Sequence, residues 1–77
     1  MISKLKGEVS DFDFRSVIID VSGVGYRVFV SQNFHQKIRP GNIMEVWTHL
    51  AAKENSLDLY GFEKREDLDF FEMLISV

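Results

Sequence analysis

Histidine and carboxylate side chains are the groups in this sequence that could hold a metal ion or transfer protons. His35 and His49 lie on different segments, and the chain has no cysteine and no His-x-x-x-His pair. A zinc site normally needs three or four suitably spaced ligands, so this spacing does not predict one. Asp11 and Asp13 form a close pair, but aspartates beside a serine are typical of a solvated turn. We therefore expect no metal ion and no cofactor, and we assign neither aspartate a catalytic role.

Aromatic side chains indicate a second kind of chemistry, the stacking of nucleic-acid bases. The rings that could form such a surface are Tyr26, Phe29, Trp47 and Tyr60. They occupy alternating strand positions, however, where aromatic residues more often pack in a core. The sequence also lacks a phosphate-binding Gly-x-x-x-x-Gly-Lys-Ser/Thr loop and a Gly-x-Ser-x-Gly nucleophile elbow. We expect no catalytic residue in this chain.

Composition limits the classes of protein to consider. The chain has 77 residues and a net charge of −3. A domain of this size buries only about 60% of its unfolded surface, so self-association is expected to add buried area. The acidic balance argues against unaided nucleic-acid binding, which depends on Lys and Arg, although most cations precede Glu54 and could form a local basic face. Without a signal peptide or a run of about 20 apolar residues, we expect a cytoplasmic protein that contacts no membrane.

A glycine-containing turn organises the centre of the chain. The β-branched segment Ser16–Val21 and the alternating segment Tyr26–Val30 predict two strands, joined by a turn over Ser22–Gly25. Glycine tolerates the positive φ that tight hairpin turns demand. We therefore expect Gly23 and Gly25 to be the positions most sensitive to substitution.

The elements on either side of this hairpin follow from local patterns. Ile2–Val9 alternates as a first strand, and Gly7 inside it indicates a bulge or a close backbone crossing. Phe34 and Ile38, four residues apart, predict a short helix capped by Ser31. Further predicted features are strands over Ile43–Leu50 and Leu57–Tyr60, a polar tip over Ala51–Ser56 between them, and a structural turn at Gly61.

The period of the pattern changes near the carboxyl end. Acids at Glu63, Glu66 and Asp67 favour a helix start. The apolar stripe that follows consists of Leu68, Phe70, Phe71, Leu74, Ile75 and Val77. Such a stripe usually packs on more protein, and no C-terminal helix signal precedes the chain end. We expect this helix to begin a further unit of a longer chain.

These elements together describe a mainly β fold. Five strands, a short helix between the third and fourth, and a C-terminal α-helix predict a five-stranded Greek-key barrel of the oligonucleotide-binding (OB) type. We expect the barrel to cover residues 1–62 and the separate helix to cover residues 63–77.

Several segments resemble the amino-terminal region of the bacterial RuvA family, the Holliday-junction-binding subunits of the RuvAB branch-migration complex. The similarity runs in order along essentially the whole chain. Its segments are Met1–Gly7, Val21–Val28, Thr48–Leu50, Lys53-Glu54, Leu59-Tyr60-Gly61-Phe62, Phe70-Phe71 and Leu74-Ile75.

The resemblance implies a homotetramer that holds four-way DNA junctions and, with the RuvB ATPase, promotes branch migration in recombination and repair. In that family a second domain with helix-hairpin-helix motifs makes most DNA contacts, and a third recruits RuvB. Residues 63–77 would then be the first helix of a truncated second domain. The chain would be part of the non-catalytic DNA-binding subunit of a helicase complex.

The resemblance also implies a role for the tip between the fourth and fifth strands. In the family this tip is an acidic pin of two neighbouring carboxylates at the junction centre. Glu54 matches the first acid, whereas Asn55 replaces the second and halves the formal charge. Asp58 could supply the missing charge, and Lys53 is a candidate for contact with the DNA backbone.

Two other functions remain open from the residues themselves. The first is a general single-stranded-nucleic-acid-binding OB module, which would use exposed aromatic rings. The second is a structural oligomerisation barrel, in which Glu54 and Asn55 are an ordinary solvated hairpin tip.

Overall fold

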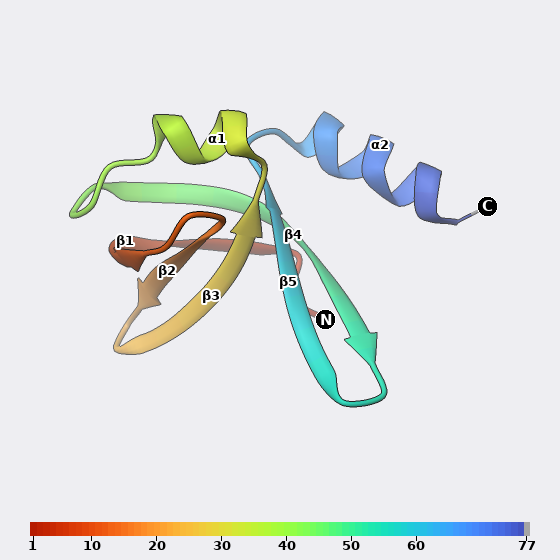
Figure 1. The fold of residues 1–77 in the computed structure, drawn as a ribbon, viewed down its shortest axis with the longest axis horizontal. Coiled ribbons are helices and arrows are strands. Elements are labelled where there is room, and N and C mark those ends of the chain that lie inside the picture. The colour runs from red at the N-terminus through yellow and green to blue at the C-terminus, as the bar shows by residue number, and fades with distance from the viewer. Residues whose placement is uncertain (77) are drawn as a thin grey trace.

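The computed structural model describes residues 1–76 as five strands and two helices (Figure 1). The elements are β1 (Lys4–Phe12), β2 (Ser16–Val21), β3 (Val24–Val30), α1 (Gln32–Lys37), β4 (Ile43–Lys53), β5 (Ser56–Phe62) and α2 (Arg65–Ile75). Val77, which we expected to widen the apolar stripe of the last helix, lies outside the described residues.

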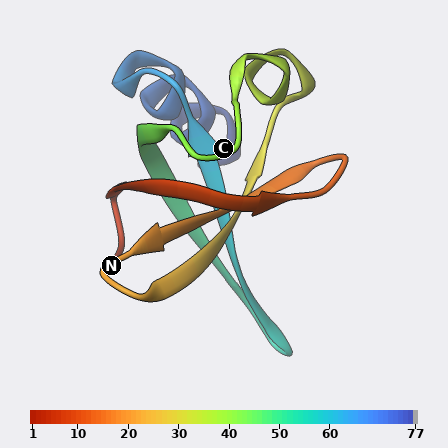
Figure 2. The ribbon, with the colours of Figure 1, turned by 90° about the vertical axis from the view of Figure 1, so that its left-hand side faces the viewer.

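The strands close into one barrel in the order β1-β2-β3-β5-β4. β3 and β5 run parallel, and the other neighbouring strands are antiparallel. Both helices lie at one end of the barrel, and the β4–β5 hairpin projects from the other end (Figures 1 and 2). This is the predicted OB-type architecture, with α1 between β3 and β4 and α2 after the barrel.

β1 turns a corner of the barrel because its two halves pair with different strands. Lys4–Glu8 pairs with β4, and the register with β2 shifts between Val9 and Asp11. Gly7 lies at the corner, where an added Cβ would collide with the backbone carbonyl of Asp20. Of the two alternatives predicted for Gly7, the close backbone crossing is confirmed, and the register shift lies beyond it, between Val9 and Asp11. The strand also continues three residues beyond its predicted end at Val9, to Phe12.

The barrel interior is filled mainly by β-branched side chains. Val17, Ile19, Val28 and Val46 are completely buried. Thr48 is also buried, and its hydroxyl donates to the carbonyl of Ile2 at 2.8 Å. Because the buried polar group has a partner, it costs little to hold in the core.

The β2–β3 hairpin turns on two residues, Ser22 and Gly23, with φ of 53° and 91°. The carboxylate of Asp20 accepts the Gly23 N–H at 2.8 Å and closes the turn. The predicted turn was too long, because β3 already begins at Val24. Gly25 therefore lies in a strand, opposite Asp20 and without a positive φ, so the conformational reason for its sensitivity was wrong.

Gly61 was also expected in a turn and instead lies buried in β5. An added Cβ there would collide with Val28 Cγ1 and stand 2.7 Å from Val46 Cγ2. Gly61 is therefore constrained by the core behind it.

The short helix α1 begins as its sequence predicts. The hydroxyl of Ser31 accepts the N–H of Phe34 at 3.2 Å, which is an N-cap bond. The Phe34 side chain is buried and belongs to the core cluster of the barrel. Packing of this one ring explains how so short a helix is held in place.

The helix α2 lies against β4 and β5 through a narrow contact. Leu68 is its buried residue, and the Phe71 ring packs at 5.0 Å from the ring of Phe62. The hydrophobic side chains that α2 leaves exposed are Phe70, Met73, Leu74 and Ile75. The predicted stripe is therefore only partly covered within residues 1–76.

Candidate nucleic-acid interface

The β4–β5 hairpin carries the residues that the sequence predicts for a junction-binding site. The two strands pair from Trp47 opposite Phe62 out to Lys53 opposite Ser56. Only Glu54 and Asn55 remain outside the ladder, so they form the turn at the end of the projection (Figure 1). The predicted tip of six residues is thus a two-residue turn on a longer hairpin.

The two faces of the outer hairpin differ in chemistry because strand side chains alternate. Ala52 lies opposite Leu57 on one face, where Leu57 is 71% exposed. Lys53 and Asp58 lie on the other face, with 3.5 Å between the ammonium nitrogen and a carboxylate oxygen. The projection therefore has an apolar face and an ion-paired face.

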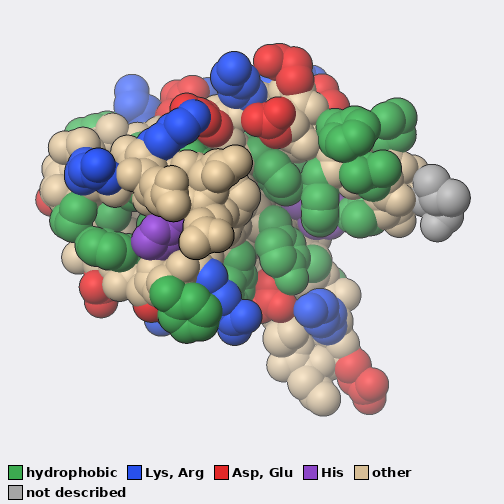
Figure 3. Space-filling model, turned by 45° about the horizontal axis from the view of Figure 1, so that its top comes forward, with side chains coloured by type: hydrophobic (Ala, Val, Ile, Leu, Met, Phe, Trp, Pro, Cys, Tyr) green, Lys and Arg blue, Asp and Glu red, His purple; other side chains and the backbone are tan. Residues whose placement is uncertain are grey.

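The charge at the turn comes from Glu54. Asp58 is paired with Lys53 and only 26% exposed, so it does not add a free charge beside Glu54. Within residues 1–76, no Lys, Arg or His forms an ion pair with Glu54. Figure 3 shows the hairpin as a protrusion with an acidic side chain at its end. One lysine and two acids leave residues 53–58 with a formal charge of −1.

The backbone of the turn places no special demand on its residue types. Within residues 1–76, Ser22 is the only non-glycine residue with a positive φ, so Glu54 and Asn55 have ordinary negative values. Aspartate and glutamine therefore fit these positions without backbone strain. The charge of the tip can be changed without changing its shape.

The four aromatic residues considered for base stacking do not form a single surface. Trp47 has the Lys4 ammonium at 5.0 Å and the Arg65 guanidinium at 5.8 Å from its ring centroid. Tyr26 is half-buried against the core. Phe29 and Tyr60 lie together, with 6.0 Å between their ring centroids.

These two rings line a groove of about 480 Å³ that the sequence did not predict. Its lining residues include Arg15, Phe29, Lys53, Asp58, Tyr60 and Phe71. They come from the β1–β2 connection, β3, β4, β5 and α2. No local sequence signal could identify the groove, because its lining residues come from segments that are far apart in the sequence.

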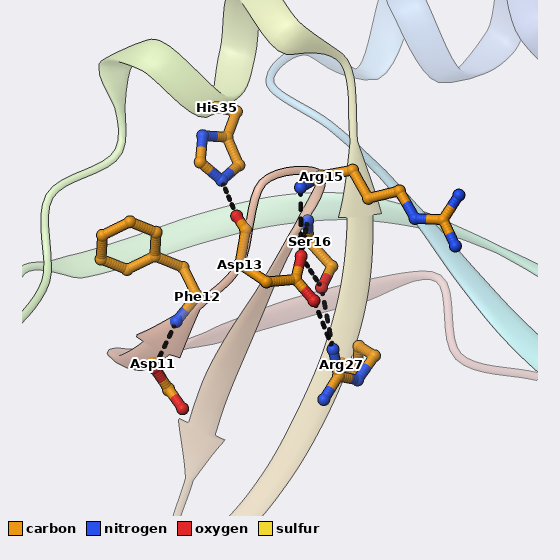
Figure 4. Close-up of polar contacts among 7 residues, drawn as sticks. All are labelled: Asp11, Phe12, Asp13, Arg15, Ser16, Arg27 and His35. Carbon is orange, nitrogen blue, oxygen red and sulfur yellow. Dashed lines mark hydrogen bonds and ion pairs between the residues drawn. The ribbon is translucent and has the colours of Figure 1, made fainter.

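The β1–β2 turn is held by the carboxylate of Asp13 (Figure 4). Asp13 accepts the backbone N–H groups of Arg15 and Ser16 at 3.0 and 2.9 Å, and the Arg27 guanidinium at 2.9 Å. Hydrogen bonds to the ionised carboxylate lower the pKa of Asp13 from 3.8 to about 2, and the bond from the Arg15 N–H makes the largest contribution. Asp13 therefore has a structural role in this turn, whereas Asp11 caps only its neighbour Phe12.

The two histidines make separate structural contacts. An imidazole nitrogen of His35 bonds to the backbone carbonyl of Asp13, and its ring packs edge-on against Phe12. His49 lies 2.8 Å from a carboxylate oxygen of Glu72 and contacts the ring of Phe71. No group of three His, Asp or Glu side chains in residues 1–76 could hold a metal ion.

Helices of membrane-spanning length and hydrophobicity are absent from the described part of the chain.

A closed five-stranded barrel with a projecting, acid-tipped hairpin defines an OB-fold domain. The family model of the RuvA N-terminal domain matches residues 1–61, and the chain belongs to this family. The resemblance seen in the sequence is therefore confirmed.

Whole-chain similarity to curated relatives agrees with the family match. The Holliday junction branch migration complex subunits RuvA of Alkaliphilus oremlandii and Rickettsia bellii are 42% and 43% identical over 77 residues. That of Caldanaerobacter subterraneus subsp. tengcongensis is 36% identical over 78 residues. Each alignment covers all of this chain but 40%, 38% and 42% of the respective relative. The chain thus spans about two fifths of the length of these relatives.

Proposed function

We propose that this chain is the barrel domain of a Holliday-junction-binding subunit. In this role it forms a homotetramer that holds a four-way DNA junction and works with the RuvB ATPase in branch migration, in the cytoplasm. The names of the curated relatives support the class of function. The observation that carries the proposal for this chain is the unpaired Glu54 at the end of the projecting hairpin.

An unpaired carboxylate at this place repels the phosphates of DNA. Two unit charges 4 Å apart in water interact by about 1 kcal/mol. In a tetramer the Glu54 groups of four hairpins meet at the junction centre and act together. Intact duplexes are then disfavoured at the centre, and separated strands pass around the acidic tips.

Lys53 is the candidate for a DNA-backbone contact on the same hairpin. It is 60% exposed although it pairs with Asp58 at 3.5 Å. An ammonium group has three donors, so Lys53 can bind a phosphate oxygen while it remains beside Asp58. This contact would position the strand next to the repelling Glu54.

Residues 63–77 begin a second domain in this proposal. The four exposed apolar residues of α2 and the greater length of the relatives support it. That domain would supply most phosphate contacts, which explains how a chain with a net charge of −3 can belong to a DNA-binding protein.

The first test is a gel-shift competition between a four-way junction and linear duplex of equal length at matched salt. Protein expressed from the full natural reading frame is expected to prefer the junction strongly. Equal binding to both DNAs would contradict the proposal.

The charge of the hairpin tip gives the second test, with Glu54→Gln and Asn55→Asp in the same full-length protein. Glu54→Gln removes the unpaired charge and is expected to tighten junction binding about fivefold, equivalent to ~1 kcal/mol. Asn55→Asp doubles that charge and is expected to weaken binding by a similar factor. Both effects should shrink with added salt. Branch migration with RuvB should change in both variants.

Glu8→Gln is the matched control, since Glu8 is an exposed acid of β1 away from the hairpin. If Glu54→Gln changes binding and branch migration no more than Glu8→Gln, the tip has no electrostatic role. The barrel would then be an oligomerisation unit only.

A further inference from the structure

A groove begins beside the acidic tip and runs between the projecting hairpin, the barrel and α2. Lys53 and Asp58 line it on the hairpin side, and Arg15 lies on the side of the β1–β2 turn. Its volume of about 480 Å³ is large enough for one nucleotide.

Aromatic rings form the floor of this groove. The centroid of Tyr60 is 6.0 Å from that of Phe29 and 6.1 Å from that of Phe71. All three rings are only half-buried, so each presents part of its surface to the groove. Every base has an apolar face that stacks on such rings, whatever the sequence.

The charge of the groove complements a phosphate. Arg15 is exposed, and its guanidinium lies 5.5 Å from the centroid of Phe29. In Figure 4 the Arg15 side chain extends away from the Asp13 carboxylate, and the contact of Arg15 with that carboxylate is made by its backbone N–H. Within residues 1–76 the Arg15 guanidinium has no ion-pair partner, and the one acid of the groove, Asp58, is paired with Lys53. The donors of Arg15 are therefore available to an anion.

We propose that this groove holds one unpaired nucleotide of a DNA strand. The phosphate binds the guanidinium of Arg15, and the base stacks on Phe29 and Tyr60. The inference rests on the proposed function for the source of the nucleotide, since strands separated at Glu54 emerge beside Lys53. The barrel then both repels duplex at its tip and retains a single strand next to it.

The test is an NMR titration of the 77-residue chain with the hexanucleotide (dT)6. Amide shifts are expected to move at Arg15, Phe29, Tyr60 and Gly61, with half-saturation near 0.1 mM, the weak end of non-specific DNA binding. Inorganic phosphate alone and thymidine alone should each produce smaller shifts at the same residues. The spectrum also reports whether each variant is folded.

Arg15→Ala is the variant that tests the phosphate contact, and the turn should persist because Asp13 uses only the backbone of residue 15. Binding of (dT)6 is expected to weaken about tenfold, and the slope of log K against log salt should fall by about 0.7. Lys6→Ala removes an equal charge from an exposed position of β1 outside the groove and should leave binding unchanged.

Three results would overturn the inference. The first is that (dT)6 moves no amide shifts at the groove, and the second is that Lys6→Ala weakens (dT)6 binding as much as Arg15→Ala does. The third is that Arg15→Ala changes the oligomeric state and leaves (dT)6 binding intact. The last would make the groove a contact between copies of the chain. Junction preference in the full-length protein without shifts at the groove overturns only this inference. Shifts at the groove without junction preference support nucleotide binding and overturn the proposed function.

Discussion

Gly61→Ala is the substitution whose effect the structure predicts most directly. The new methyl group would point into the barrel, where it meets Val28 Cγ1 and lies 2.7 Å from Val46 Cγ2. Apolar carbon atoms normally approach to about 3.5–4.0 Å, so the Val46 methyl would have to move by roughly 1 Å. Both valines are completely buried and have stiff χ1 angles. The strain therefore cannot be relieved by a simple rotation.

The expected loss of stability is large for so small a protein. Overpacking a dense core costs about 1–3 kcal/mol, and two blocked neighbours place Gly61→Ala near 3 kcal/mol. The free energy of unfolding of a 77-residue chain is about 4–12 kcal/mol. The melting temperature should accordingly fall by about 12–24 °C.

Urea unfolding followed by circular dichroism measures this loss, with two other glycine variants as controls. Gly25→Ala should cost less than about 1 kcal/mol, because its methyl would stand 3.1 Å from Ile18 Cγ2, and a small shift of that one side chain relieves the contact. Gly23→Ala should cost about 1–2 kcal/mol, because its space is open but its φ is +91°. The expected order of sensitivity is Gly61, Gly23, Gly25.

A second variant keeps the reasoning testable if Gly61→Ala does not fold. Val46→Ala removes one of the two blocking side chains, so the double variant should fold, and adding Gly61→Ala to Val46→Ala should cost less than adding it to the original protein. A Gly61→Ala cost below about 1 kcal/mol, or a double variant that is strictly additive, would refute the packing argument.

Two further predictions concern Asp13 in the β1–β2 turn and Ser31 at the start of α1. Because the pKa of Asp13 is lowered from 3.8 to about 2, its carboxylate stabilises the fold above pH ~4, and this contribution disappears as the pH falls towards 2. The difference in melting temperature between the original protein and Asp13→Asn should therefore be constant above pH ~4 and shrink towards pH 2; a constant difference down to pH 2 would contradict this. Ser31→Ala should cost about 1 kcal/mol in urea unfolding by removing the N-cap bond to Phe34, whereas Ser31→Asp should retain most of the stability. Equal losses in the two Ser31 variants would argue against the capping role.

Sequence patterns predicted the features of this protein that depend on neighbours along the chain. The β-branched run of Ser16–Val21, the cap at Ser31 and the helix period after Glu63 each involve residues within a few positions of one another. Burial then follows directly, because one face of each strand must leave water. The short motifs shared with the RuvA family were equally readable, and they led to the correct family.

Contacts between distant segments could not be read in this way. Gly61 is restricted by Val28 and Val46, which no local pattern reveals, so it was expected in a turn. The pairing of Lys53 with Asp58 depends on the exact length of the hairpin, which the sequence underestimated. Local sequence therefore determined the elements and the acidic residue at the tip. Only closure of the barrel decided which glycine is constrained, which acid stays unpaired and where Arg15 meets the aromatic groove, because these depend on long-range strand register.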